Sequence, residues 1–187
     1  RELRALLSGL PLECLSRDDL DIRVDIPETG ESLHENAILK ARGYAGLSDL
    51  TTLADDSGLE VEALGGEPGV RSSRWAGPGA SDADRIRLLL ERLRGVPPAA
   101  RGARFRAVAA IATPDGRVYA TEGTLRGVIV EEPRGGGGFG YDPVFLVPEL
   151  GKTVAQLDPE TKNRISHRAR AILAARPMLE RLAAEER

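Results

Sequence analysis

The sequence is poor in cysteine and in long apolar runs. Cys14 is the only cysteine among 187 residues, which excludes a disulfide framework or a multi-cysteine zinc site and favours a reducing cytoplasm. No apolar stretch approaches the roughly 20 residues of a transmembrane helix, and the opening "RELRALLSGL" is charged and unlike a signal peptide. A cytoplasmic protein without a membrane partner is therefore expected.

Positive and negative charges are nearly balanced. The net charge is only −3, so binding to nucleic acid through non-specific electrostatic attraction is not expected. Apolar residues make up 41% of the chain, which is enough for a hydrophobic core. The length fits a single domain over residues 1–187.

Helical and strand patterns alternate along the chain. One helix is predicted over residues 1–9, and a second through "ENAILKARGYAGL", after a capping box formed by Ser32 and Glu35. Three more helices are predicted to begin after Ser81, at Asp158 and at about Ser166, the last with an interruption at Pro177. Strands are predicted at "DIRVDI", "TTLAD" and "LEVEAL", and in a hairpin around Asp115-Gly116. Strands interleaved with helices favour a mixed α/β domain.

Two adjacent aspartates stand out in "LADDSGLEVEAL", residues 53–64. Like charges this close repel, so a cation or a proton must neutralise part of the charge of the pair. We interpret Asp55 and Asp56 as lying where a strand ends in a Ser-Gly turn, which is where α/β proteins carry many of their sites. Oxygen-rich sites of this kind suit Mg²⁺. The alternative is ordinary turn chemistry, because Asp and Ser readily bond their own backbone.

A second group of carboxylates lies earlier in the chain. Glu35 is explained by capping the helix that follows Ser32. Glu28, in "IPETGES", has no capping role. It completes a carboxylate site with Asp56 if the loops that carry the two residues converge.

A glycine-rich segment, "PRGGGGFGYDP", spans residues 133–143. It matches neither the Walker loop nor the dinucleotide-binding pattern. Glycines followed by an aromatic residue suit a loop that closely approaches a ligand, with Phe139 or Tyr141 packed on a base. A flexible linker and an RNA-binding Arg-Gly-Gly segment are the alternatives.

Basic residues gather in "TKNRISHRARA" around a predicted helix start. Lys162, His167 and Arg168 offer donors for phosphate or for a purine carbonyl group. A solvated helix face is the plainer alternative, and His34 is interpreted as having no site role. Carboxylates for a metal, cations for phosphates and an aromatic loop for a base together indicate a metal-dependent nucleotide site.

These segments resemble the inosine triphosphate pyrophosphatase family, of the RdgB/HAM1 type. The resemblance rests on "ENAILKARGYAGL", "LADDSGLEVEALGGEPGVRSSRWAG", "RGGGGFGYDPVFLVP", "GKTVAQL" and "KNRISHRARA", in that order. It implies hydrolysis of the deaminated purine triphosphates ITP, dITP and XTP to a monophosphate and pyrophosphate, with Mg²⁺. It also implies a homodimer and an ITPase-like α/β fold, with a central mixed twisted sheet flanked by helices and two lobes around a cleft.

The resemblance also assigns roles to individual residues. Asp56 becomes the general base and a metal ligand, with Glu28, or alternatively Glu35, as the second ligand. Ser57 contacts the substrate beside Asp56. The residues that it assigns to the base and sugar are Phe139, Gly140, Tyr141 and Asp142, and those that it assigns to the purine 6-oxo group are Lys162, His167 and Arg168.

The family pattern opens with a strand and a Thr-Gly-Asn-x-x-Lys loop that binds the triphosphate. This chain begins at the helix that follows, "RELRALL", so that strand and loop are expected to be missing from it. Two alternatives therefore stay open. One is a nucleotide-binding sensor without turnover, and the other is a Maf-type pyrophosphatase acting on modified pyrimidine nucleotides.

Overall fold

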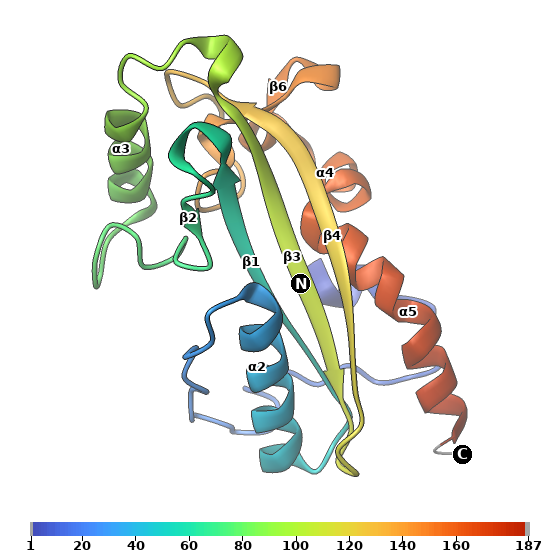
Figure 1. The fold of residues 1–187 in the computed structure, drawn as a ribbon. Coiled ribbons are helices and arrows are strands. Elements are labelled where there is room, and N and C mark those ends of the chain that lie inside the picture. The colour runs from blue at the N-terminus through green and yellow to red at the C-terminus, as the bar shows by residue number, and fades with distance from the viewer. Residues whose placement is uncertain (1, 186–187) are drawn as a thin grey trace. The chain divides into compact units, whose positions relative to one another are not determined.

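The computed structural model describes residues 2–185 (Figure 1). The helices are α1 (Glu2–Leu6), α2 (Leu33–Ser48), α3 (Asp82–Arg92), α4 (Pro159–Ile165) and α5 (His167–Glu185). The strands are β1 (Thr52–Val61), β2 (Pro68–Gly69), β3 (Gly102–Ala112), β4 (Val118–Ile129), β5 (Phe145–Val147) and β6 (Lys152–Thr153). The α/β class is confirmed.

One six-stranded sheet has the order β2-β1-β3-β4-β5-β6. β2 pairs antiparallel with β1, and β5 pairs antiparallel with both β4 and β6. The sheet of the described residues is antiparallel, so the expected mixture with parallel pairs is not found there. A tight hairpin joins β3 to β4, which is a connection that only antiparallel neighbours allow.

The chain forms two compact units. The first comprises Arg1–Asp56, Ala107–Gly123 and His167–Arg187, and the second comprises Ser57–Arg106 and Thr124–Ser166. Each unit has its own hydrophobic core. The single domain over residues 1–187 and the cleft between lobes stay predictions.

The first unit packs α5 tightly against the sheet. The buried residues of α5 include Ala169, Ala171, Ile172 and Ala175. A Cβ atom on Gly123 of β4 would lie 2.1 Å from the carbonyl oxygen of His167 and 2.5 Å from the backbone nitrogen of Ala171. Strand and helix backbones therefore touch at a position where only glycine fits.

Gly123→Ala is expected to lower the free energy of unfolding by about 3 kcal/mol, because the added methyl group must push α5 away from β4. Gly46→Ala is a matched control, since a Cβ atom there meets nothing within 4 Å on α2. It should raise stability by about 0.5–1 kcal/mol, because alanine favours a helix over glycine. Urea unfolding of both variants measures the difference, and equal stabilities would contradict the close approach at Gly123.

The second unit is built around aromatic and branched side chains. Phe105 and Phe145 stack with their ring centroids 4.3 Å apart. Leu89 and Leu93, at the end of α3, are fully buried beside this cluster. The core thus fixes α3 to the sheet within the second unit.

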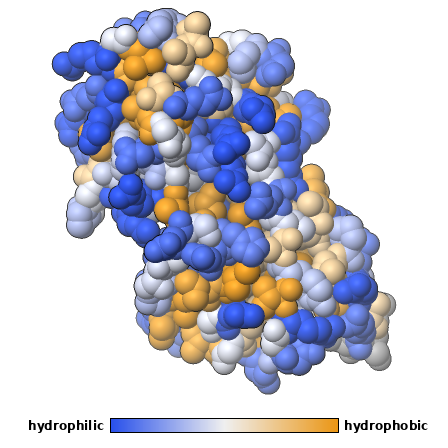
Figure 2. All heavy atoms as spheres, viewed as in Figure 1, coloured by the Kyte–Doolittle hydropathy of each residue, from blue (hydrophilic) through white to orange (hydrophobic). Residues whose placement is uncertain are grey.

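Helix α2 has a buried face of small residues. Ala37, Ala41 and Ala45 are buried there together with Asn36. On the face in Figure 2, hydrophobic residues gather in the region of α2, and Leu39 and Leu47 of that helix are exposed. Apart from Leu33 at the start of the helix, the buried residues of α2 are therefore small or polar.

Most predicted helices and the hairpin are confirmed. The Ser32 hydroxyl accepts the backbone N–H of Glu35 at the start of α2, and Ser81 forms a capping box with Asp84 at the start of α3. Asp158 caps α4 by accepting the N–H of Thr161. No helix in residues 2–185 is long and apolar enough to cross a membrane.

Three predicted features are wrong. Residues 22–30 have no regular structure, because Ile26 packs against Gly43 of α2 and not in a strand ladder. The two strands predicted around the Asp-Asp-Ser-Gly segment are one strand, β1. α5 continues through Pro177, since burial of residues on both sides of the proline, such as Ala175 and Leu179, offsets the lost backbone hydrogen bond.

Candidate active site

The two adjacent aspartates lie within β1, not at its end. Successive side chains of a strand point to opposite faces of the sheet. Asp55 Oδ2 accepts a hydrogen bond from Arg168 Nε of α5 at 2.8 Å, while Asp56 Oδ1 accepts one from Lys40 Nζ of α2 at 2.9 Å. The pleat of the strand separates the two charges, and each carboxylate has its own cationic partner.

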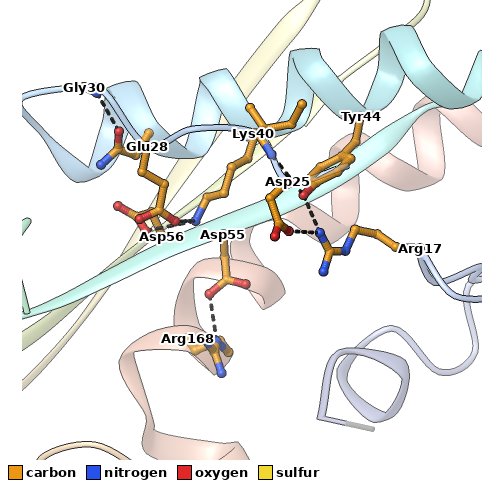
Figure 3. Close-up of polar contacts among 11 residues, drawn as sticks. Arg17, Asp25, Glu28, Gly30, Lys40, Tyr44, Asp55, Asp56 and Arg168 are labelled. Atoms are coloured by element: carbon orange, nitrogen blue, oxygen red, sulfur yellow. Dashed lines mark hydrogen bonds and ion pairs between the residues drawn. The ribbon is translucent and has the colours of Figure 1, made fainter. Parts of the chain in front are cut away.

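Asp56 belongs to a group that we call the carboxylate–lysine cluster, made of Glu28, Lys40 and Asp56. Lys40 Nζ donates to Glu28 Oε1 at 2.8 Å and to Asp56 Oδ1 at 2.9 Å (Figure 3). The side chains of Lys40 and Asp56 are only 17% and 10% exposed. One ammonium group therefore bridges two carboxylates in a largely dry environment.

Burial and charge compete in this cluster. Burial raises the pKa of Asp56, Glu28 raises it further, and the hydrogen bond from Lys40 opposes the rise without cancelling it. Burial lowers the pKa of Lys40, but its hydrogen bonds to Glu28 and Asp56 outweigh this and leave that pKa raised. Asp56 is consequently a stronger base than an ordinary aspartate.

The segment that carries Glu28 is held against α2. The Gly30 N–H donates to Asn36 Oδ1 at 2.8 Å, and the Arg17 guanidinium donates to both Asp25 and the Tyr44 hydroxyl at 2.6 Å (Figure 3). These contacts fix an irregular segment without a strand ladder.

Glu35 lies in a different setting from Glu28. Its Oε2 accepts the backbone N–H of Glu31 at 2.7 Å, just before α2. Glu35 therefore stabilises the start of that helix. The structure thus places Glu28 in the carboxylate–lysine cluster and Glu35 at the helix cap.

The residues of the cluster fit a small divalent cation. Asp56 Oδ2 is buried and has no hydrogen-bond partner among residues 2–185, which leaves an oxygen available to a ligand. Mg²⁺ is commonly held by one or two carboxylates and by phosphate oxygens. The described part of the chain has no group of three or more His, Cys, Asp or Glu side chains suited to a metal. Within this cluster, the two carboxylates that could hold one are Glu28 and Asp56.

The first two residues of α5 bring two predicted site residues into the first unit. His167 is 9% exposed. Arg168 is oriented by its bond to Asp55, and its side chain is 24% exposed. Asp55 thus fixes the direction of a guanidinium group.

In the second unit, Phe139, Asp142 and Lys162 form an aromatic–lysine cluster. Asp142 Oδ2 accepts one hydrogen bond from the N–H of Phe139 at 3.0 Å and another from Lys162 Nζ at 2.6 Å. Lys162 Nζ lies 4.9 Å from the centroid of the Phe139 ring. Phe139 is 53% exposed and Asp142 only 3%, so a buried carboxylate holds an exposed ring and an ammonium group side by side.

Tyr141 lies in the core of the second unit. It is 4% exposed, and its hydroxyl donates to the carbonyl oxygen of Ser72 at 3.0 Å. Burial raises its pKa to about 12. The contacts of Tyr141 anchor the glycine-rich loop, and its predicted contact with a base stays a prediction.

A groove of about 690 Å³ runs along the glycine-rich loop and α3. The Gly140 N–H points to Asp82 at the start of α3 and donates to its Oδ2 at 2.6 Å. Phe139 and Asp82 both line this groove.

The predicted site residues fall into two groups. The first unit brings Glu28 and Asp56 together and also holds His167 and Arg168, while the second brings Phe139, Gly140, Asp142 and Lys162 together. Ser57 follows Asp56 in β1 and is half-buried. The predicted grouping of Lys162 with His167 and Arg168 stays a prediction.

Sequence reasoning missed Lys40. A signal was present, since Asn36 and Lys40 are four residues apart and therefore share a helix face. That face is otherwise apolar, with Ala37 and Ala41 buried. Two polar side chains on the buried face of a helix indicate a partner on the neighbouring element.

Comparisons with known proteins identify relatives of this chain. The Ham1 family matches residues 1–178. A dITP/XTP pyrophosphatase of Methylococcus capsulatus is 52% identical over 180 residues, covering 94% of this chain and 89% of that protein. A dITP/XTP pyrophosphatase of Geobacter sulfurreducens is 48% identical over 172 residues, covering 92% and 86%.

Solved structures agree as well. A HAM1 protein from Coxiella burnetii superposes with a TM-score of 0.86 at 42% identity, covering 98% of this chain and 92% of that one. The Ham1 protein of Staphylococcus aureus superposes with a TM-score of 0.83 at 39% identity, covering 100% and 93%. Sequence and fold agree, and this chain belongs to the Ham1 family.

Proposed function

We propose that this chain hydrolyses deaminated purine nucleoside triphosphates, namely ITP, dITP and XTP, to the nucleoside monophosphate and pyrophosphate. The observation that carries the proposal is the buried carboxylate–lysine cluster, found in a chain about half identical to dITP/XTP pyrophosphatases. Such a reaction removes damaged nucleotides from the pool of DNA and RNA precursors.

In this reaction a water oxygen attacks the α-phosphorus, and the bond from that phosphorus to the bridging oxygen of the β-phosphate breaks. Asp56 orients the water and accepts its proton, helped by the raised pKa of the buried carboxyl group. Lys40 supplies a positive charge to phosphate oxygens. We also propose Mg²⁺ as the cofactor, held by Glu28 and Asp56, where it would neutralise charge on the phosphates.

The aromatic–lysine cluster would favour purines with a 6-oxo group over adenine. The exposed Phe139 ring offers a surface on which a base stacks, and Lys162 offers a donor beside it. A 6-oxo group accepts from such a donor, whereas the 6-amino group of adenine leaves two donors facing each other. The same role for His167 and Arg168, a homodimer and a cytoplasmic location remain parts of the proposal that rest on the family resemblance and on the single cysteine.

A substrate panel tests the proposal. Pyrophosphate release should be measured from ITP, dITP, XTP, ATP, GTP and pyrimidine triphosphates with Mg²⁺. We expect kcat/KM for ITP and XTP to exceed that for ATP by about 100-fold or more, because a mismatched buried donor is costly. Preferred turnover of modified pyrimidine nucleotides would favour the Maf-type activity instead, and tight binding of ITP without pyrophosphate release would favour the sensor.

A further inference from the structure

A residue in the first turn of α3 forms a hydrogen bond to the backbone of the glycine-rich loop. Asp82 Oδ2 accepts the backbone N–H of Gly140 at 2.6 Å. The other oxygen of Asp82 pairs with the guanidinium group of Arg85, whose Nε donates to the carbonyl oxygen of Ser73 at 2.8 Å. A chain of polar contacts thus runs from the loop through α3 to the segment that follows β2.

The loop residue held in this way is next to the exposed aromatic ring. Phe139 lies between Gly138 and Gly140, whose φ angles are +76° and +60°, a backbone shape that glycine adopts readily. Two consecutive N–H groups each donate to a carboxylate, that of Phe139 to Asp142 and that of Gly140 to Asp82. Asp142 belongs to the loop itself, so of these two carboxylates Asp82 is the one that tethers the loop to another element.

Capping of α3 does not require the Asp82 carboxylate. Ser81 is the N-cap residue, and its partner in the capping box is Asp84. The Gly140 N–H lowers the pKa of Asp82, and Arg85 lowers it as well. Asp82 is therefore ionised near neutral pH, and its bond to the loop is charge-assisted.

We propose that Asp82 is a positioning residue for base recognition: it holds the loop so that Phe139 presents its ring beside Lys162, and it thereby sets the affinity for the purine base. This inference rests on the proposed function of the aromatic–lysine cluster. Asp82 bonds to Gly140 and Arg85 and not to the carboxylate–lysine cluster, so its effect falls on substrate binding and not on the chemical step.

The test compares Asp82→Ala with Asp84→Ala in the full chain, using ITP and Mg²⁺. Asp84→Ala is the matched control, because it removes a carboxylate from the same helical turn and breaks the capping box without touching the loop. We expect Asp82→Ala to raise KM for ITP about 10-fold, the effect of losing one charge-assisted hydrogen bond, with kcat within about twofold. Asp84→Ala should lower the melting temperature and leave KM within about twofold.

A conservative variant separates positioning from general stability. Asp82→Asn keeps an oxygen that accepts the Gly140 N–H, so it should recover most of the lost affinity. If Asp82→Ala and Asp84→Ala lowered kcat alike and left KM unchanged, Asp82 would be a stabilising residue only and the proposal would be overturned.

Amide hydrogen exchange tests the hydrogen bond from Gly140 to Asp82 without measuring enzyme turnover. The Gly140 N–H should exchange at least about 10-fold faster in Asp82→Ala than in the wild-type chain, since its acceptor is gone, and at the wild-type rate in Asp84→Ala. Unchanged exchange in Asp82→Ala would overturn the tether even if ITP is hydrolysed. A wild-type chain that fails to hydrolyse ITP would overturn the proposed function, while the exchange rates would still decide whether Asp82 holds the loop.

Discussion

Asp56→Asn is expected to reduce kcat for pyrophosphate release from ITP by about 1000-fold, the typical contribution of a positioned general base. The substitution keeps the size of the side chain and removes its ability to accept a proton. It also removes half of the negative charge that the carboxylate–lysine cluster offers to a cation. The reaction is best followed by coupled detection of pyrophosphate at saturating ITP and Mg²⁺.

The neighbouring residue provides the control. Asp55→Asn removes a carboxylate one position earlier in β1, but on the opposite face, where it pairs with Arg168. That variant should keep kcat within several-fold and change mainly KM, because it removes the Asp55 partner of the Arg168 guanidinium group and leaves Lys40 in place. Similar losses of kcat in both variants would contradict the assignment of the base to Asp56.

Lys40→Met is expected to lower the free energy of unfolding by about 3 kcal/mol at neutral pH in the absence of Mg²⁺, as removal of one partner from a buried ion pair does. Methionine retains the length of the side chain without its charge. Glu28 and Asp56 would then lose the ammonium group that bridges them. Urea unfolding measures the loss, and Lys152→Met, at an exposed position, is the matched control.

The loss of unfolding free energy in Lys40→Met should depend on pH, and the titration of Asp56 sets the direction of this dependence. Burial already raises the pKa of Asp56 above its ordinary value of 3.8, and removal of Lys40 raises it further. A carboxyl group whose pKa is raised by folding favours the folded state below its ordinary pKa, and that advantage disappears as the pH rises through the folded-state value. The deficit of Lys40→Met should therefore be small near pH 4 and full at neutral pH.

Added Mg²⁺ provides a further readout for the same variant. A divalent cation held by Glu28 and Asp56 would replace the missing ammonium group, so Mg²⁺ should stabilise Lys40→Met more than the wild-type chain. An equal response of both chains to Mg²⁺ would contradict the assignment of these carboxylates to the metal.

Local signals in the sequence predicted most of the helices and the hairpin. Ser32, Ser81 and Asp158 each cap the helix that they were expected to start. Capping depends on residues three positions apart, so it is readable from a short window. The strand predicted at residues 21–26 failed because alternation within a window cannot show whether a partner strand exists.

The carboxylate–lysine cluster was predictable only in part. Asp56 and Glu28 were expected to meet, and both are bound by Lys40, which sequence reasoning passed over. Lys40 lies in an ordinary helical pattern, and its spacing from Asn36 on an otherwise apolar face is the one local signal that distinguishes it from a solvated lysine. Its role follows from a contact with a residue 16 positions away.

By itself the sequence determined the family, the capped helices, the hairpin and the residue types of a nucleotide site, since these depend on order and short spacing. Only the tertiary structure decided how the paired aspartates work. Because β1 continues through them, its pleat sends Asp56 to Lys40 and Asp55 to Arg168, which is 113 positions away in the chain. Such partners are set by packing of distant elements, where burial strengthens each charge interaction, and no short stretch of sequence contains that information.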